Sequence, residues 1–312
     1  MSFDVLGIGC VAVDDLLYVD AYPLADAKLR IRRAERHFGG LTGTALVAAA
    51  KLGAKCGFAG LLGIDELSRS VEQNFLDHGI DTTNVVRRED AQPIHSVIIV
   101  AEEGNTRNVF YEYSAPIGAD PAGPSEECIR DAQVLFLDHI GVPGNIRAAA
   151  IAREAGIPVV ADLEEVHDPK FPDLLELIDH VVISERFALT YTNCKTAGEA
   201  AAALWHPDRD TVAVTCGDRG VWFVSSIHPE PTHLPAFPVN VVDTTGCGDV
   251  FHGAYAVSLA YGDGVEERLR FASAAAALKA TRPGGQTGAP NLRELTAFLS
   301  KNAFTGYERE DL

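Results

Sequence analysis

The residues best suited to chemistry in this sequence lie between 241 and 251, where the chain reads Val-Val-Asp-Thr-Thr-Gly-Cys-Gly-Asp-Val-Phe. Two glycines let the backbone approach a ligand closely, and the first N–H groups of a helix have no partner within that helix. Such a turn can hold a phosphoryl group while the carboxylate of Asp249 takes a proton from an attacking hydroxyl. The residues expected to act together are Gly246, Cys247, Gly248 and Asp249. This pattern predicts a site that transfers phosphate to an alcohol.

The glycine turn is expected to join a buried strand to an apolar helix. Val239, Val241 and Val242 predict the end of the strand, and the helix should continue to about Tyr261. An acidic residue in the first turn of a helix can also serve only to offset the helix dipole. The β-branched run before the two glycines favours the catalytic interpretation of Asp249.

The motif Asp-Thr-Thr-Gly-x-Gly-Asp-x-Phe closely resembles the C-terminal signature of the ribokinase-like (PfkB) family of carbohydrate and nucleoside kinases. Residues 237–290 look most like the bacterial sulfofructose kinase branch, with ketohexokinase a more distant relative. The resemblance extends from about residue 5 to residue 299. It implies ATP with Mg²⁺ as the phosphoryl donor, Asp249 as the catalytic base and residues 246–249 as the anion hole.

The composition indicates a globular protein of 312 residues whose 47% hydrophobic content is ample for a buried core. The formal net charge of −18 would repel a polyanion, so nucleic acid and anionic membrane surfaces are poor candidates for partners. A nucleotide bound to its metal ion is still a possible ligand, because its binding depends on the charge near the site and not on the net charge of the protein. No apolar segment approaches membrane-spanning length and no signal peptide is evident, so we expect a cytoplasmic protein.

The six cysteines are scattered, without a Cys-x-x-Cys pair or histidines at metal-binding spacing. They are expected to be reduced thiols, as in cytosolic proteins. Cys247 is placed at a helix N-terminus, where a thiol can have a lowered pKa. We interpret it as filling a small-residue position that is usually Ala in the family that the sequence resembles.

The N-terminal part holds the candidate sugar-binding residues. A short buried strand is expected up to Cys10, and ligands of open α/β sheets lie beyond the carboxyl ends of strands. Either Asp14 or Asp15 could contact sugar hydroxyls there, and the resemblance selects Asp14. A glycine pair then opens an Ala-rich helix. The residues that the resemblance assigns to the substrate here are Asp14, Gly39, Gly40 and Thr44, the last at a position where the family usually has Asn.

Two segments do not fit the pattern expected for the main sheet, and they are expected to form a small β lid. They cover roughly residues 12–37 and 93–115, the second as a hairpin. Lys28 in the first segment could reach an anionic group of the substrate, although a solvated strand face is the commoner arrangement. Glu112 at the end of the hairpin could face the substrate. Apolar strand edges on this lid would favour a homodimer.

From residue 131 onward strands and helices alternate, which predicts a doubly wound, mainly parallel α/β sheet with helices on both faces. Asp138 and Asp162 follow strand ends on the expected ligand side, and Asp138 is a candidate contact for the substrate. Residues 307–312 are expected to form a loose acidic tail.

The resemblance places nucleotide and cation ligands in the same half of the chain. The expected nucleotide contacts are Thr215, Gly217, Gly220 and Gly285, the last in a loop over the adenine. Asp243, Thr245 and the loop of residues 282–288 are expected to bind a monovalent cation such as K⁺. Ser184 and Phe187 replace the Asn and Glu of the family's magnesium motif, which leaves Glu185 as the candidate Mg²⁺ ligand.

We therefore expect one ribokinase-like domain over residues 1–312 that phosphorylates a primary hydroxyl of a small sugar, with a ketose favoured. Glu112 and Asp138 would oppose an anionic substrate, whereas a sulfosugar kinase would need a cationic pocket. A nucleoside kinase would need an aromatic stack between lid and sheet. A non-catalytic sugar sensor would be stabilised by sugar yet release no ADP.

Overall fold

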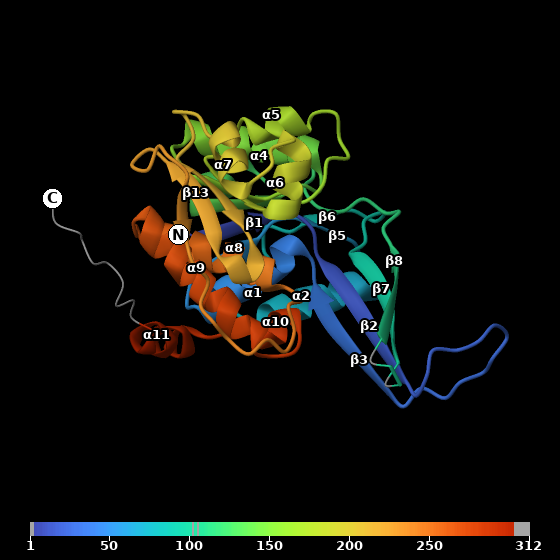
Figure 1. Cartoon of the computed structure of the whole chain (residues 1–312). Helices are drawn as coiled ribbons and strands as arrows, with labels where there is room; N and C mark the ends of the chain where they lie inside the picture. Colours follow the sequence, from blue (N-terminus) through green and yellow to red (C-terminus); the bar gives the residue numbers. More distant parts are fainter. Residues whose placement is uncertain (1–2, 102, 105, 303–312) are drawn as a thin grey trace.

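The structure is a computed structural model that describes residues 3–101, 103–104 and 106–302. A body built on an eight-stranded sheet stands beside a separate four-stranded sheet, which we call the small sheet (Figure 1). None of the helices in this described part has both the length and the apolar character needed to cross a bilayer. The tail expected at residues 307–312 lies outside the described residues.

The large sheet has the strand order β14-β13-β12-β11-β10-β9-β1-β4. The strands from β12 to β4 in this order are parallel, and β13 and β14 are antiparallel to their neighbours. This arrangement confirms the predicted mainly parallel α/β sheet. The strands are β1 (Phe3–Ile8), β4 (Cys56–Phe58), β9 (Ala132–Asp138), β10 (Val159–Asp162), β11 (His180–Ser184), β12 (Thr211–Thr215), β13 (Val221–Ser225) and β14 (Thr232–Leu234).

Helices cover both faces of this sheet, and each face has its own hydrophobic core. Strand β9 shows why the strands are apolar throughout: Val134 and Phe136 enter one core, whereas Leu135 and Leu137 enter the other. The helices on the first face are α1 (Leu41–Lys51), α2 (Glu66–Asp77), α8 (Cys247–Ala260), α9 (Val265–Ala280) and α11 (Leu292–Lys301). The helices on the second are α3 (Glu126–Arg130), α4 (Val142–Glu154), α5 (Phe171–Leu175), α6 (Glu185–Thr192) and α7 (Ala197–Leu204).

The small sheet has the order β3-β2-β7-β8 and is built from both segments that were expected to form a lid. Its strands are β2 (Ala12–Val19), β3 (Arg33–Gly39), β7 (Ile94–Ala101) and β8 (Thr106–Glu112). The loop of residues 20–32 between β2 and β3 extends away from the body (Figure 1). A short pair, β5 (Leu61–Leu62) and β6 (Val86–Arg87), and the single turns η1 (Gly217–Arg219) and α10 (Gly285–Gly288) complete the elements.

The prediction of a buried strand ending at Val242 is wrong. The chain after β14 is irregular, and Val241 and Val242 are 59% and 65% exposed. Instead of pairing with a strand, the N–H groups of Val242 and Asp243 both donate to the Ala280 carbonyl at the end of α9, at 2.7 and 3.1 Å. Val239 and Val241 line a cavity rather than a sheet.

Helix α8 begins where the glycine turn was expected, after Gly246, whose φ of 74° favours glycine. It packs closely on α1, because a Cβ at Gly253 would lie 2.2 Å from the Ala45 carbonyl oxygen. Its other neighbour is α9. The helix that presents the candidate catalytic turn is therefore held within the core of the molecule.

Candidate active site

Asp249 lies in the first turn of α8 and is partly buried. Its carboxylate makes no hydrogen bond to any residue that the structure describes, so its oxygens are available to a ligand. Burial raises the pKa of Asp249 well above its usual range, the charges of Asp162 and Glu164 raise it further, and His252 lowers it. A carboxylate with a raised pKa accepts a proton more readily than an ordinary one, which suits a general base.

The amides of the glycine turn form a cradle at the start of α8. The Cys247 N–H is not part of it, because it donates to the Thr244 carbonyl oxygen at 3.2 Å. Within the described residues the N–H groups of Gly246, Gly248 and Asp249 find no acceptor. The sequence predicted a cradle of four amides, and the tight turn through Thr244 leaves three of them free.

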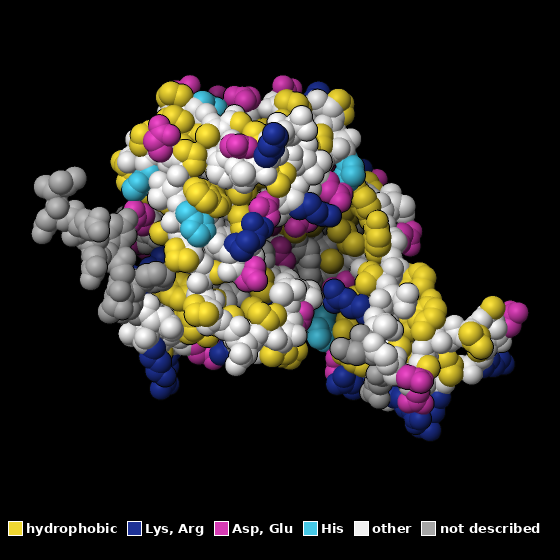
Figure 2. Space-filling model, viewed as in Figure 1, with side chains coloured by type: hydrophobic (Ala, Val, Ile, Leu, Met, Phe, Trp, Pro, Cys, Tyr) yellow, Lys and Arg dark blue, Asp and Glu magenta, His cyan; other side chains and the backbone are white. Residues whose placement is uncertain are grey.

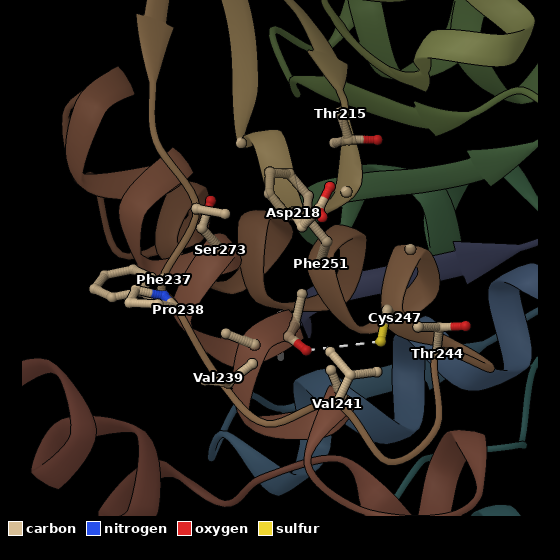
Figure 3. A pocket seen from close by; sticks show the side chains of 17 residues that line it. Thr215, Asp218, Phe237, Pro238, Val239, Val241, Thr244, Cys247, Phe251 and Ser273 are labelled. Carbon is tan, nitrogen blue, oxygen red and sulfur yellow. Dashed lines mark hydrogen bonds between the residues drawn. The ribbon is translucent and has the colours of Figure 1, made fainter.

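A cavity of about 680 Å³ opens beside this cradle (Figure 3). Thr215 at the end of β12, together with Gly217 and Gly220, lines one side. Apolar side chains from Phe237 to Val241 line the other side, and Phe251 of α8 also borders it. This volume is within the range of nucleotide-sized ligand sites.

Cys247 lines the same cavity, and its Sγ lies 3.7 Å from the Ala276 carbonyl oxygen (Figure 3). Burial raises the pKa of this thiol, and the charge of Lys279 opposes that only in part. The position of Cys247 at a helix N-terminus suggested that the pKa of its thiol could be lowered, and the structure contradicts this. Cys247 is a protonated, weakly reactive thiol near neutral pH.

The small sheet brings Asp14 to the glycine pair that precedes α1. Asp14 accepts a hydrogen bond from Ser96 of β7, and burial raises its pKa. A Cβ at Gly39 would lie 3.3 Å from Asp14 Oδ2. Gly40 has φ 84°, and a Cβ there would lie 2.5 Å from the Val11 Cα. The three residues assigned to the sugar therefore lie together, at the junction of the small sheet and the body.

Two other residues assigned to the substrate lie elsewhere. Lys28 is in the exposed loop of residues 20–32, beyond the strands of the small sheet. Glu112 pairs with His95 of β7, whereas Asp14 pairs with Ser96, so alternation along the strand places them on opposite faces of the small sheet. We call the face of the small sheet that carries Asp14 and Ser96 the Asp14 face. The structure thus separates both Lys28 and Glu112 from the Asp14 face.

Asp138 is 0% exposed, and three groups of the protein donate hydrogen bonds to its carboxylate. Its Oδ2 accepts the Cys10 N–H and the Thr42 hydroxyl, both at 2.7 Å, and its Oδ1 accepts the Ile140 N–H at 2.8 Å. The prediction that Asp138 contacts substrate is therefore replaced by a structural role: it ties the ends of β1 and β9 to the start of α1. Asp138 is the last residue of β9 itself, and Thr42 of α1 bonds to its side chain.

The loop of residues 282–288 does not close over the cavity, because none of its residues is among those that line it. It packs instead against the start of α8, since a Cβ at Gly246 would lie 2.8 Å from the Gly285 Cα and 3.5 Å from Thr44 Cγ2. Gly285 and Thr44 thus support the cradle from behind. The contact of Gly285 with the nucleotide stays a prediction.

Asp243, the first residue of the motif, is enclosed by the chain. Its Oδ1 accepts the Thr245 N–H at 2.9 Å, and its Oδ2 accepts the Gly284 N–H at 2.8 Å and lies 3.7 Å from Lys279 Nζ. Burial raises the pKa of Asp243, but these hydrogen bonds and the charge of Lys279 lower it overall. The oxygens expected to hold a monovalent cation face a lysine ammonium, so a K⁺ ion does not fit there.

Glu185 begins α6 and forms an ion pair with the guanidinium of Arg219. No group of three or more acidic, histidine or cysteine side chains that could hold a metal occurs in residues 3–101, 103–104 and 106–302. Mg²⁺ usually keeps several waters and takes its other ligands from one or two carboxylates and the substrate phosphates. Glu185 is the partner of Arg219 in this structure, and its role as a Mg²⁺ ligand stays a prediction.

A model of the pfkB family carbohydrate kinases matches residues 8–292. The chain belongs to the pfkB family of carbohydrate kinases. The family predicted from the sequence is thereby confirmed, and its sulfofructose kinase branch stays a prediction. This pfkB kinase is an ATP-dependent sugar kinase, which transfers a phosphoryl group to a hydroxyl.

Named relatives of this pfkB kinase resemble it over nearly its whole length. Ribokinase of Haemophilus influenzae is 29% identical over 302 residues, covering 94% of this chain and 97% of the relative. Fructokinase-1 of Oryza sativa subsp. japonica is 28% identical over 319 residues, covering 95% and 97%. The structure of Arabidopsis thaliana ribokinase complexed with ribose and ATP has a TM-score of 0.83 at 24% identity, covering 96% and 99%.

Two residues around the site of this pfkB kinase were not assigned from the sequence. His252 Nδ1 lies 2.8 Å from the Gly248 carbonyl oxygen and 3.1 Å from Asp162 Oδ2, and its Nε2 lies 2.8 Å from the Val182 carbonyl oxygen. Its spacing of three residues from Asp249 places both on one helix face, a signal that the sequence did contain. Arg107 of β8 reaches across to the Thr245 hydroxyl at 3.5 Å, which no local pattern indicates.

The acidic neighbours of Asp249 predict a pH effect. A general base fails as pH falls through its pKa, and the charge of Asp162 raises that pKa. In Asp162→Asn we expect the acidic limb of the kcat profile to move to lower pH. Glu164→Gln, at an exposed position, should give a smaller shift in the same direction.

This expectation is checked by steady-state rates between pH 5 and pH 9 at saturating substrates. Asp168→Asn, a carboxylate outside this cluster, serves as the control and should leave the profile in place. An acidic limb that stays fixed or moves to higher pH in Asp162→Asn would contradict the assignment of Asp249 as the titrating base.

Proposed function

We propose that this kinase transfers the γ-phosphoryl of ATP to a primary hydroxyl of a small uncharged sugar, with a ketose as the favoured acceptor. The observation that carries this proposal is the free carboxylate of Asp249 beside the free amides of Gly246 and Gly248. Of these groups Gly248 lines the 680 Å³ cavity, and Arg107 of the small sheet reaches Thr245, next to Gly246.

In this mechanism the nucleotide occupies the cavity, with its terminal phosphate at the cradle. The amides and the positive end of the α8 dipole stabilise negative charge that develops on the transferring group. Asp249 takes the proton of the sugar hydroxyl as its oxygen attacks the γ-phosphorus and the bond to the β-phosphate oxygen breaks. Mg²⁺, held by the phosphates of ATP, neutralises their charge when bound.

The small sheet acts as the lid in this proposal. Its Asp14 face looks toward the body, since Arg107 lies on that face and contacts Thr245 beside the cradle. The surface is hollowed between the body and the small sheet, with charged side chains of both signs around the rim (Figure 2). Sugar bound there would be shielded from water, which otherwise competes as the phosphoryl acceptor.

The choice of sugar rests on what borders the Asp14 face. Lys28, the expected contact for a sulfonate, lies in an exposed loop, which supports an uncharged acceptor over a sulfosugar. The named relatives are a ribokinase and a fructokinase, so ribose and fructose are the first candidates. Nucleosides and sulfofructose belong in the same screen as the competing acceptors.

A coupled assay of ADP release over ketoses, aldopentoses, sulfofructose and nucleosides tests the proposal, with Asp249→Asn as the blank. We expect turnover with one small neutral sugar at a kcat/KM at least about tenfold above that of any sulfosugar or nucleoside, a factor worth 1.4 kcal/mol of transition-state binding. If sulfofructose or a nucleoside is the preferred substrate, the proposal of an uncharged sugar as the acceptor is wrong. Stabilisation by sugar without ADP release under any condition would mean a sensor.

Asp14 should govern sugar binding without affecting ATP. A charge-assisted hydrogen bond contributes about 1.5–3 kcal/mol, so Asp14→Asn is expected to raise the KM for sugar roughly 10- to 100-fold. Asp15→Asn is the matched control, because Asp15 pairs with Arg36 and His95 on the opposite face. Initial rates with each substrate varied in turn measure both constants, and equal effects of the two variants on the sugar KM would refute the assignment.

The homodimer stays a proposal. Strand β8 is an edge of the small sheet and exposes Val109, Phe110 and Tyr111 by 49–70%. Unpaired strand edges with apolar side chains favour association with another chain. Light scattering of the purified protein would give the solution mass, and a monomer at assay concentrations would reject the dimer.

A further inference from the structure

Lys279 is a charged residue in an unusual place. It lies in the last turn of α9 and its side chain is 0% exposed. Its Nζ donates to the Asp243 carbonyl oxygen at 2.7 Å and to the Arg282 carbonyl oxygen at 3.2 Å. With the Asp243 carboxylate at 3.7 Å, three oxygens surround the ammonium, which offsets the cost of burying its charge.

These oxygens are of the kind that bind a monovalent cation: two backbone carbonyls and a carboxylate. They also belong to Asp243 and to the loop of residues 282–288, the segments that the sequence resemblance implied for K⁺. An ammonium carries the same single charge as K⁺. The packing leaves little further space, since a Cβ at Gly288 would lie 3.1 Å from Lys279 Cε and 3.1 Å from the Pro283 carbonyl oxygen.

The lysine is connected to the cradle through Asp243. One carboxylate oxygen of Asp243 accepts the Thr245 N–H, immediately before Gly246, and the other accepts the Gly284 N–H. Gly285 in turn packs against Gly246. The charge at Lys279 therefore holds the two segments that shape the start of α8.

We propose that the Lys279 ammonium is a built-in monovalent cation, which holds the phosphate cradle in shape and makes this kinase independent of K⁺. The inference rests on the proposed function only in treating the cradle as the phosphate site. A tethered ammonium is present at all salt concentrations, whereas a free ion stabilises the native state by RT ln(1 + [ion]/Kd), which depends on its concentration.

The first test uses the unaltered protein at constant ionic strength. Melting temperature and kcat are measured in KCl, NaCl and choline chloride, with ATP and the preferred sugar. We expect the three salts to give the same kcat within about twofold and melting temperatures that do not depend on which cation is present. Saturable activation of kcat by K⁺ of threefold or more over the other salts would overturn the proposal.

The second test removes the charge in Lys279→Met, which keeps most of the side-chain volume. We expect a lower melting temperature, a kcat at least tenfold lower, and a saturable recovery of both with K⁺ or ammonium but not with choline. Lys51→Met is the matched control, because Lys51 donates to the carbonyls of Gln286, Thr287 and Ala289 without touching Asp243. The Lys51→Met variant should have a lower melting temperature, and this temperature should not depend on which cation is present.

The two variants behaving alike, with no cation preference in either, would overturn the proposal. If Lys279→Met fails to fold, the salt comparison on the unaltered protein still decides. The melting curves need no turnover, so they separate a failure of this inference from a failure to find the sugar.

Discussion

Asp249→Asn is expected to lower kcat by about 10³-fold while the protein folds normally. General-base catalysis by a positioned side chain contributes about 10²–10⁴-fold, and asparagine keeps the shape of aspartate without accepting a proton. Because Asp249 makes no hydrogen bond to the described residues, its replacement breaks no structural contact. Single-turnover measurement of ADP formation isolates the chemical step.

The same variant should be more stable than the unaltered protein at neutral and higher pH. The folded-state pKa of Asp249 is raised, so the native state favours the protonated form and loses stability as pH rises through that pKa. Asparagine does not titrate, so the difference in melting temperature should grow as pH increases from about 4, the usual pKa of an aspartate.

Asp263→Asn provides the control for this experiment. Asp263 follows the far end of the same helix and accepts a hydrogen bond from Ser258, so the variant removes a carboxylate without reaching the site. Its kcat should stay within about threefold of the unaltered value. A kcat above one-tenth of normal in Asp249→Asn, or a strongly lowered melting temperature, would contradict the assigned role.

Gly248→Ala is expected to lower kcat/KM for ATP by about 10²-fold or more with no loss of stability. Gly248 lines the cavity, and a Cβ added there meets no atom within 4 Å. The methyl group would occupy the space in front of the cradle, and a displacement of about 1 Å can cost 10²-fold in rate. Alanine within a helix is otherwise favoured over glycine by about 0.5–1 kcal/mol.

Gly246→Ala separates this effect from simple damage to the turn. Gly246 has φ 74°, and its added Cβ would lie 2.8 Å from the Gly285 Cα. That variant should lose both stability and activity, whereas Gly248→Ala should lose activity alone. Calorimetry together with initial rates at varied ATP distinguishes the two, and full activity of Gly248→Ala would place the phosphate elsewhere.

The architecture and the turn at Gly246 could be predicted because both depend on local patterns. Alternating apolar strands and helices specify a layered sheet, and a glycine pair before a helix marks a place where backbone approaches a ligand. The pairing of residues far apart in sequence could not be inferred in this way. Val241 and Val242 have strand propensity, yet the Val242 N–H donates to the Ala280 carbonyl oxygen at the end of a helix.

Charged residues were the harder part of the site to predict. Asp138 and Glu112 were both placed near strand ends from the sequence, but burial under α1 and the face of β8 decide what each can touch. Lys279 would be interpreted as an ordinary cation in the last turn of a helix, where it offsets the dipole. Only the fold brings the Asp243 and Arg282 carbonyls around it.

The division between body and small sheet has a consequence for how such kinases diversify. Asp249 and its amides belong to a helix fixed in the core, whereas Asp14 and Ser96 belong to a sheet with its own hydrogen-bonded strands. Under the proposed function, selection could therefore change the strands that contact the acceptor without altering the turn that transfers phosphate. For protein engineering, the four strands of the small sheet would then be the part to exchange when the enzyme is directed to a new alcohol.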